Sequence, residues 1–100
     1  MAIENVIQIP GTIAPGRSDW QTRRLYIRFR YTGGYSNFKL EIFSIALQRI
    51  RSITFSCSGG QAVCWWHGET DSGDPCSGGV YVYKISVGSS KHQGKIMVLR

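Results

Sequence analysis

The chain has 100 residues, which suffices for one small hydrophobic core and leaves no room for two. Apolar types make up 42% of the residues and charged types 18%, which excludes an acidic or low-complexity disordered chain. No stretch approaches the roughly 20 apolar residues of a membrane-spanning helix. Residues 1–10 contain Glu4, Asn5 and Gln8 where a secretory leader has its apolar core, so we expect no leader there.

The chain is basic, with 12 Lys and Arg against 6 Asp and Glu and a net charge of +6. Such a surface attracts polyanions, whether nucleic acid, anionic polysaccharide or anionic lipid headgroups. No run of five basic residues occurs, which favours the simpler interpretation that these charges keep strand surfaces soluble. Most of the excess lies in the first half of the chain, at Arg17, Arg23, Arg24, Arg28, Arg30, Lys39, Arg49 and Arg51.

Three cysteines occur, Cys57, Cys64 and Cys76, an odd number that leaves one thiol outside any single disulfide. Cys57 and Cys64 flank a Ser-Gly-Gly turn and could form a disulfide across a hairpin. With His67 the three cysteines form a loose zinc set, but the close Cys-x-x-Cys spacing of structural zinc sites is missing. Buried, inert thiols in strands are the interpretation that we favour.

Period-two alternation of apolar and polar residues predicts strands over most of the chain. Residues 25–31 place Leu25, Ile27 and Phe29 on one face and arginines on the other, as in an antiparallel strand with one dry side. Glycines 33 and 34 then predict a hairpin that leads into an alternating strand at 38–42. A short N-terminal edge strand is expected at 5–9.

The second half continues the pattern. Residues 43–53 would also suit a short helix, but we favour a strand, a turn at 46–48 and a strand at 49–57. Further strands are expected at 62–66, 80–87 and 95–99, with loops at 67–79 and 88–94. About seven short strands without an amphipathic helix predict an all-β fold, an immunoglobulin-like antiparallel β-sandwich of the fibronectin III-like kind.

Residues 66–85, WHGETDSGDPCSGGVYVYKI, resemble the signature of immunoglobulin-like domains of flagellar hook-capping proteins and of type IX secretion C-terminal sorting domains. That signature has Trp-Asp-Gly, then Asp-x-Gly, then a small residue and Gly before a hydrophobic-Tyr strand. It ends on Lys, three hydrophobic residues and a basic one, and residues 95–100 here have Lys, four hydrophobic residues and Arg. The resemblance covers about 24–100 and is specific from 60. The chain departs from the family pattern at four places. His67 replaces an Asp, Leu47 replaces a Gly at the central turn, and Cys76 replaces an aliphatic residue. The family's Asn-Pro-Phe opening is absent.

The motif residues are expected to be structural. Trp66 is large enough to fill the space between two sheets, burying on the order of 200 Å². Gly68 and Gly73 allow the backbone to turn, and the Asp71 side chain caps backbone N–H groups in a tight turn. Gly79 lets the chain re-enter the sheet, and Tyr81 sets its ring on the core and its hydroxyl on a loop carbonyl, as tyrosine corners do.

Catalysis and metal binding have little support in the sequence. His67 could act as a base for the Cys64 or Cys76 thiol, but no paired acid and base set exists, so we expect no enzyme activity. Glu69, Asp71 and Asp74 could supply calcium ligands. Ordinary turn capping explains the same carboxylates, so we expect no metal and no cofactor.

Two polymer ligands are the remaining alternatives. Arg23, Arg24, Arg28 and Arg30 with Tyr26 could form a basic aromatic strip for nucleic acid, although RNA-binding signatures are absent, so this partner is disfavoured. Trp20 and Trp65 could be exposed rings on which a polysaccharide stacks. Trp65 points away from Trp66 by alternation, and we expect it to pack under a loop.

The resemblance implies a non-catalytic interaction or sorting module, the C-terminal part of a longer secreted or surface protein, found outside the cell. The partner would be a protein of the secretion machinery or a neighbouring subunit. Alternatives are a structural subunit that forms oligomers or filaments by edge pairing, and a module that binds anionic polysaccharide. Recognition is expected on the final strand, at a sheet edge. That strand comprises Lys95, Ile96, Met97, Val98, Leu99 and Arg100.

Overall fold

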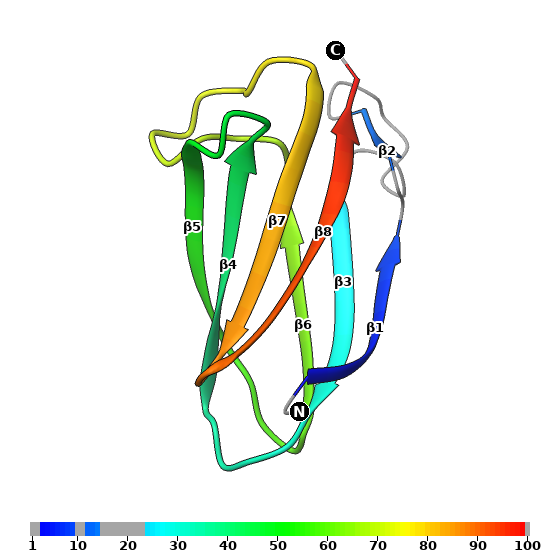
Figure 1. Ribbon diagram of the computed structural model, residues 1–100, viewed down its shortest axis with the longest axis vertical. Coiled ribbons are helices and arrows are strands. Elements are labelled where there is room, and N and C mark those ends of the chain that lie inside the picture. Colours follow the sequence, from blue (N-terminus) through cyan, green and yellow to red (C-terminus); the bar gives the residue numbers. More distant parts are fainter. Residues whose placement is uncertain (1–2, 10–11, 15–23, 100) are drawn as a thin grey trace.

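The structure is a computed structural model that describes residues 3–9, 12–14 and 24–99 (Figure 1). Its described part contains strands and connecting loops and no helix. Among these residues there is accordingly no helix that could cross a membrane. The strands are β1 (Ile3–Ile9), β2 (Thr12–Ile13), β3 (Leu25–Tyr31), β4 (Asn37–Ser44), β5 (Arg49–Ser56), β6 (Gln61–Trp66), β7 (Gly79–Val87) and β8 (Ser90–Val98).

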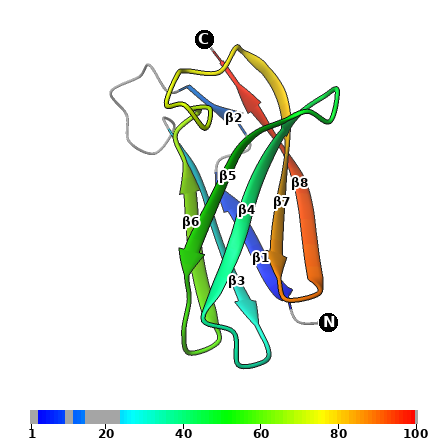
Figure 2. The same ribbon diagram turned by 90° about the vertical axis from the view of Figure 1, so that its left-hand side faces the viewer.

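Two sheets pack face to face, one with the order β1-β3-β6 and one with the order β2-β8-β7-β4-β5 (Figure 2). All described pairings are antiparallel except that of the two-residue β2, which runs parallel to the end of β8. The predicted all-β sandwich is therefore confirmed. The segment 43–53, for which a helix was the alternative, completes β4, turns and enters β5.

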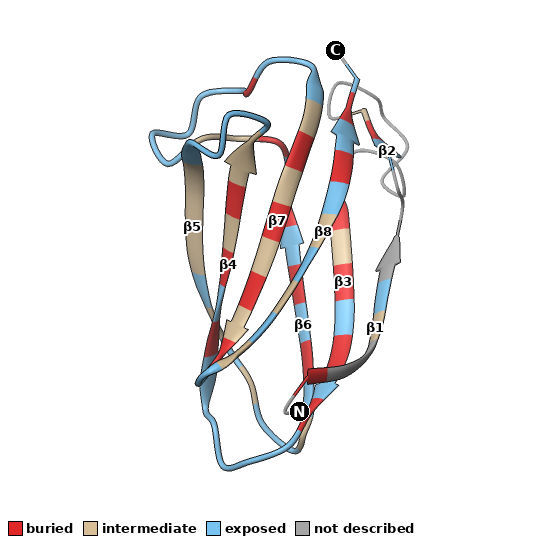
Figure 3. Ribbon diagram, viewed as in Figure 1, coloured by how far each residue is buried: buried red, intermediate tan, exposed pale blue. Residues whose placement is uncertain are grey.

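Alternating side chains build the core, as the bands of buried residues along β3, β4, β6 and β7 show (Figure 3). Phe29 of one sheet meets Phe38 of the other edge-on, with ring centroids 5.0 Å apart. No polar or charged residue is buried among the described ones, so the space between the sheets is filled by apolar contacts. The fully buried side chains include Ile13, Leu25, Ile27, Leu40, Ile42, Trp66, Ile85 and Val87.

The cysteines do not form the disulfide considered for Cys57 and Cys64, because all three are free thiols. Cys64 points into the core from β6, opposite Ile27 of β3. Cys57 follows β5 in the other sheet, where its Sγ contacts the Tyr35 carbonyl oxygen at 3.7 Å. The two thiols thus belong to different sheets and face different neighbours. Burial raises the pKa of the Cys64 thiol to about 12, which makes it a poor nucleophile.

The β4–β5 turn contains a strained residue. Leu47 has a φ of +63°, and it is the one non-glycine residue in the described part with a positive φ. A Cβ in this left-handed region collides with the following carbonyl oxygen and costs about 1–2 kcal/mol. The family to which the chain bears a resemblance has a glycine here, a choice that the backbone conformation explains.

We predict that Leu47→Gly stabilises the protein. The Leu47 side chain is 73% exposed, so its loss removes little packing, whereas the relief of strain outweighs the extra chain entropy of glycine. The free energy of unfolding in urea should rise by about 1 kcal/mol. Ile45→Gly is the matched control, because Ile45 is 71% exposed in the same turn without a positive φ, and it should be destabilising. A loss of stability in Leu47→Gly would contradict the assigned conformation.

The buried thiol predicts a loss of stability at alkaline pH. Cys64 stays protonated in the folded protein, while in the unfolded chain it ionises near its ordinary pKa of 9.0, so rising pH favours unfolding between about 9 and 12. From pH 8 to 10.5 the wild type should lose about 2 kcal/mol more than Cys64→Ala, measured by urea unfolding at both pH values. Burial also raises the pKa of Tyr83 in both proteins, and the Coulombic effect of Cys64 adds to that rise in the wild type alone.

Val98→Ala is the control, because it leaves a cavity at an equally buried position without removing a thiol. The stability of this variant should depend on pH as that of the wild type does. Equal pH dependence in Cys64→Ala and the wild type would show that Cys64 ionises freely in the folded state.

Candidate functional site

Trp66 lies at the end of β6 between the two sheets, with none of its surface exposed. Its indole Nε1–H donates a hydrogen bond to the Glu69 carbonyl oxygen at 2.8 Å. Its ring meets the Tyr81 ring edge-on at 5.8 Å between centroids. The side chain therefore fills core space and also fixes the first turn of the loop that follows it.

The loop 67–78, here called the corner loop, turns on glycines. Gly68 has a φ of +82° and accepts a backbone hydrogen bond from Cys76, and Gly73 has a φ of +89° and donates one to Thr70. Gly79, at +148°, begins β7. The Tyr81 hydroxyl donates to the Ser77 carbonyl oxygen at 2.6 Å, which ties the exit of the corner loop to the core.

Asp71 acts across the sandwich edge rather than within its own turn. Its Oδ1 accepts a hydrogen bond from the backbone N–H of Ser52 on β5 at 2.9 Å, and its own N–H donates to the Ile50 carbonyl oxygen at 2.9 Å. The expectation of local capping is therefore incomplete, because the edge of β5 offers unsatisfied backbone groups to the loop. The corner loop covers the upper half of that edge.

Arg51 adds to the same contact. Its guanidinium donates to the Thr70 carbonyl oxygen at 3.3 Å and lies 3.8 Å from the Glu69 carboxylate. The remaining carboxylate, that of Asp74, accepts from the Ser72 hydroxyl at 3.1 Å. The three acidic groups considered for calcium thus make three separate contacts.

No group of three metal-ligating side chains occurs within residues 3–9, 12–14 and 24–99. The zinc set considered from the sequence is likewise not brought together. Cys64 and Cys76 are buried, whereas His67, the first residue of the corner loop, is exposed.

The final strand is not a free edge over its whole length, which corrects the expectation for 95–100. Thr12 and Ile13 of β2 pair with Met97 and Val98, and the Leu99 N–H donates to the Ile13 carbonyl oxygen at 2.8 Å. Ile96 and Val98 are buried core residues. Upstream of Met97, no described strand pairs with the outer side of β8, and Arg100 lies outside the described residues.

The outer face of the three-stranded sheet brings together side chains that are far apart in the sequence. Tyr26 lies opposite Trp65, Arg28 opposite Val63 and Arg30 opposite Gln61 across β3 and β6. Trp65 is 41% exposed and meets Phe55 of β5 edge-on at 5.2 Å, so it closes the gap between the sheets instead of packing under a loop. Trp20 and Arg23, also considered as ligand-binding residues, lie outside the described residues.

Comparison with solved structures places this fold among known domains. The chain is similar to a segment of dimeric latent PorU from Porphyromonas gingivalis, with a TM-score of 0.66 and 17% identity over 94% of this chain and 9% of that one. It is also similar to the CARDB domain of the PF1109 protein from Pyrococcus furiosus, solved with di-metal ions, with a TM-score of 0.53 and 12% identity, over 98% of this chain and 86% of that one.

No protein-family model matches the chain, and no curated protein is a significant relative. At such low identity the two structural similarities establish the fold alone, and they confirm a β-sandwich of the immunoglobulin-like type. The chain spans about a tenth of the length of PorU.

Proposed function

We propose that this chain is a non-catalytic interaction module of a longer surface or secreted protein, and that it serves as a sorting address of the type IX kind. The observation that carries the proposal is the corner loop, where the residues of the sorting-domain resemblance make their contacts. Trp66 and Tyr81 clamp the two ends of the loop, and glycines with positive φ occupy the turns between them. The PorU similarity supports a module of a longer chain, because the fold there occupies 9% of the protein.

The surface offered to a partner is the upstream half of β8. The Leu99 N–H points to β2, and backbone direction alternates along a strand, so the N–H groups of Lys91 and Gln93 point to the same side. No described strand takes up these groups. A partner segment could add there as a further strand, with main-chain hydrogen bonds supplying the affinity.

A secretion assay in a type IX-competent bacterium tests this proposal. An exported reporter is fused ahead of this chain, and its delivery to the surface is measured for the wild type, Gln93→Pro and Gln93→Ala. Proline removes the outward N–H and leaves the pairing with β7 intact, so Gln93→Pro should lose at least tenfold in delivery. Gln93→Ala keeps the N–H and should deliver like the wild type.

Thermal unfolding of the purified variants shows whether they fold. Surface delivery is compared only between proteins that have equal melting temperatures. Failure of the wild-type fusion to reach the surface would overturn the sorting role. Equal delivery by all three fusions would overturn the assignment to β8. Deletion of residues 95–100 is unsuitable, because it removes the buried Ile96 and Val98.

The open edge also favours a second candidate, a structural subunit that pairs with copies of itself. Backbone groups of β5 below Ser52 have no described partner strand either, so β8 of one copy could pair with β5 of the next and form an open chain. Sedimentation at increasing concentration separates the two functions. Concentration-dependent polymers that Gln93→Pro abolishes would support self-assembly, and a monomer at all concentrations would exclude it.

A further inference from the structure

The outer face of β1, β3 and β6, here called the arginine face, combines guanidinium groups, an amide and aromatic rings. Its outward side chains on β3 are Tyr26, Arg28 and Arg30, and on β6 they are Gln61, Val63 and Trp65. Ile7 of β1 lies beside Arg28 and is 41% exposed. None of these residues belongs to the corner loop or to the β8 edge of the proposed function.

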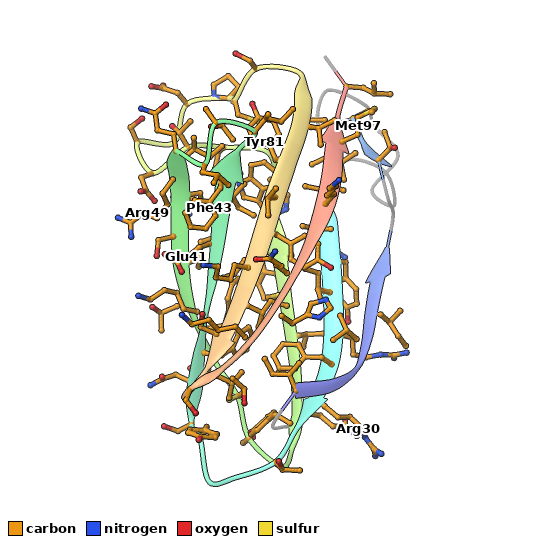
Figure 4. The ribbon with its side chains drawn as sticks, in the orientation of Figure 1. Arg30, Glu41, Phe43, Arg49, Tyr81 and Met97 are labelled. Atoms are coloured by element: carbon orange, nitrogen blue, oxygen red, sulfur yellow. The ribbon has the colours of Figure 1, made fainter. Side chains whose placement is uncertain are left out.

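The positive charge on this face is available to a ligand. Arg28 and Arg30 are exposed and form no ion pair with a described side chain. Figure 4 shows Arg30 extending away from the sandwich. The side chains lie two residues apart on one strand, which sets their Cα atoms roughly 6.6 Å apart. Arg24 continues the row, with its guanidinium 5.5 Å from the centre of the Tyr26 ring.

A hollow of about 330 Å³ lies within the arginine face. Two guanidinium groups and a carboxamide supply its polar wall, and Ile7 supplies its apolar wall. Phe29 also borders the hollow, but its ring is buried in the core and packs against Phe38. Its volume falls at the lower end of the range for small-ligand sites. A ring with one apolar side and charged substituents fits such a mixed wall. The lining residues are Ile7, Arg28, Phe29, Arg30 and Gln61.

The chemistry of this face favours a carboxylated sugar over a nucleic acid. Guanidinium groups bind carboxylates through two parallel hydrogen bonds. Single-stranded nucleic acid needs a series of rings that stack successive bases. Here the Arg24 guanidinium lies over Tyr26, which leaves Trp65 as the exposed ring, and its edge contact with Phe55 holds that ring in place.

The opposite face of the sandwich is also basic, but its charges come mainly from lysines. The outer surface of β4, β7 and β8 carries lysines, at Lys39, Lys84, Lys91 and Lys95. Arg49 of the neighbouring β5 lies 3.6 Å from Glu41 (Figure 4). Lys84 lies over the Phe43 ring. Lysine acts as a point charge without the planar fork that matches a carboxylate. Both faces are basic, but the paired-hydrogen-bond chemistry is concentrated on the arginine face.

We propose that the arginine face binds an acidic polysaccharide. The Arg28 and Arg30 guanidinium groups hold sugar carboxylates, Gln61 bonds to a hydroxyl, and Trp65 stacks against a sugar ring. This binding is independent of sorting, because it uses side chains of the β1-β3-β6 sheet, whereas the β8 edge belongs to the other sheet.

Calorimetric titration with oligogalacturonate tests the proposal, with the fully methyl-esterified oligomer as a neutral ligand of the same backbone. Arg28→Gln/Arg30→Gln should weaken binding of the acid form at least tenfold. Lys39→Gln/Lys91→Gln is the matched control, since it removes the same charge from two exposed residues of the opposite face and should weaken binding less than twofold. The ester should bind at least tenfold more weakly than the acid.

A second measurement does not depend on a variant that must fold. In the ¹⁵N spectrum of the wild type, oligogalacturonate should shift the Trp65 indole signal and leave that of the buried Trp66 unchanged. Equal losses in the two double variants, or equal binding of acid and ester, would overturn the proposal. Tighter binding of a single-stranded DNA of equal charge would assign the face to nucleic acid instead.

Discussion

The hydrogen bond from the Trp66 indole to the Glu69 carbonyl oxygen is the contact on which the rest of this structure depends. The ring is wedged between the sheets, so its N–H has a fixed direction, and a buried donor without a partner would cost about 1–3 kcal/mol. Fixing Glu69 places Thr70 and Asp71 against β5, where they pair with Arg51, Ile50 and Ser52. One side chain thus joins the core to the cover of a sheet edge.

This arrangement separates three tasks on one small sandwich. The corner loop is scaffolding and protects the upper part of β5 from unwanted pairing. Under the proposed function, the upstream half of β8 pairs through its main-chain groups with a partner strand. The arginine face lies on the opposite sheet and offers side chains rather than backbone. Strand addition and side-chain recognition therefore do not compete for the same residues.

Local patterns in the sequence were sufficient for the core and for most of the strands, but not for β2 or for the first half of β8, which lie where loops were expected. The alternation around Phe29, Trp66 and Ile85 predicts which side chains are buried, because each strand has one dry face. Contacts between distant segments could not be predicted this way. The bond of Asp71 to Ser52, the parallel pairing of Ile13 with Val98 and the position of Trp65 opposite Tyr26 all depend on sheet order, which periodicity does not encode. For that reason the free edge expected over 95–100 was wrong at residues 97–99, where β2 pairs with the end of β8.

Amide hydrogen exchange after replacing the Trp66 indole by the isosteric benzothiophene tests the central claim most directly. The change keeps the shape of the ring and removes the N–H donor. The account predicts that the amides of Ser52 and Asp71 exchange at least tenfold faster, while that of Leu40, in the central strand β4, changes much less. Unchanged protection at Ser52 and Asp71, or an equal acceleration at all three amides, would contradict it.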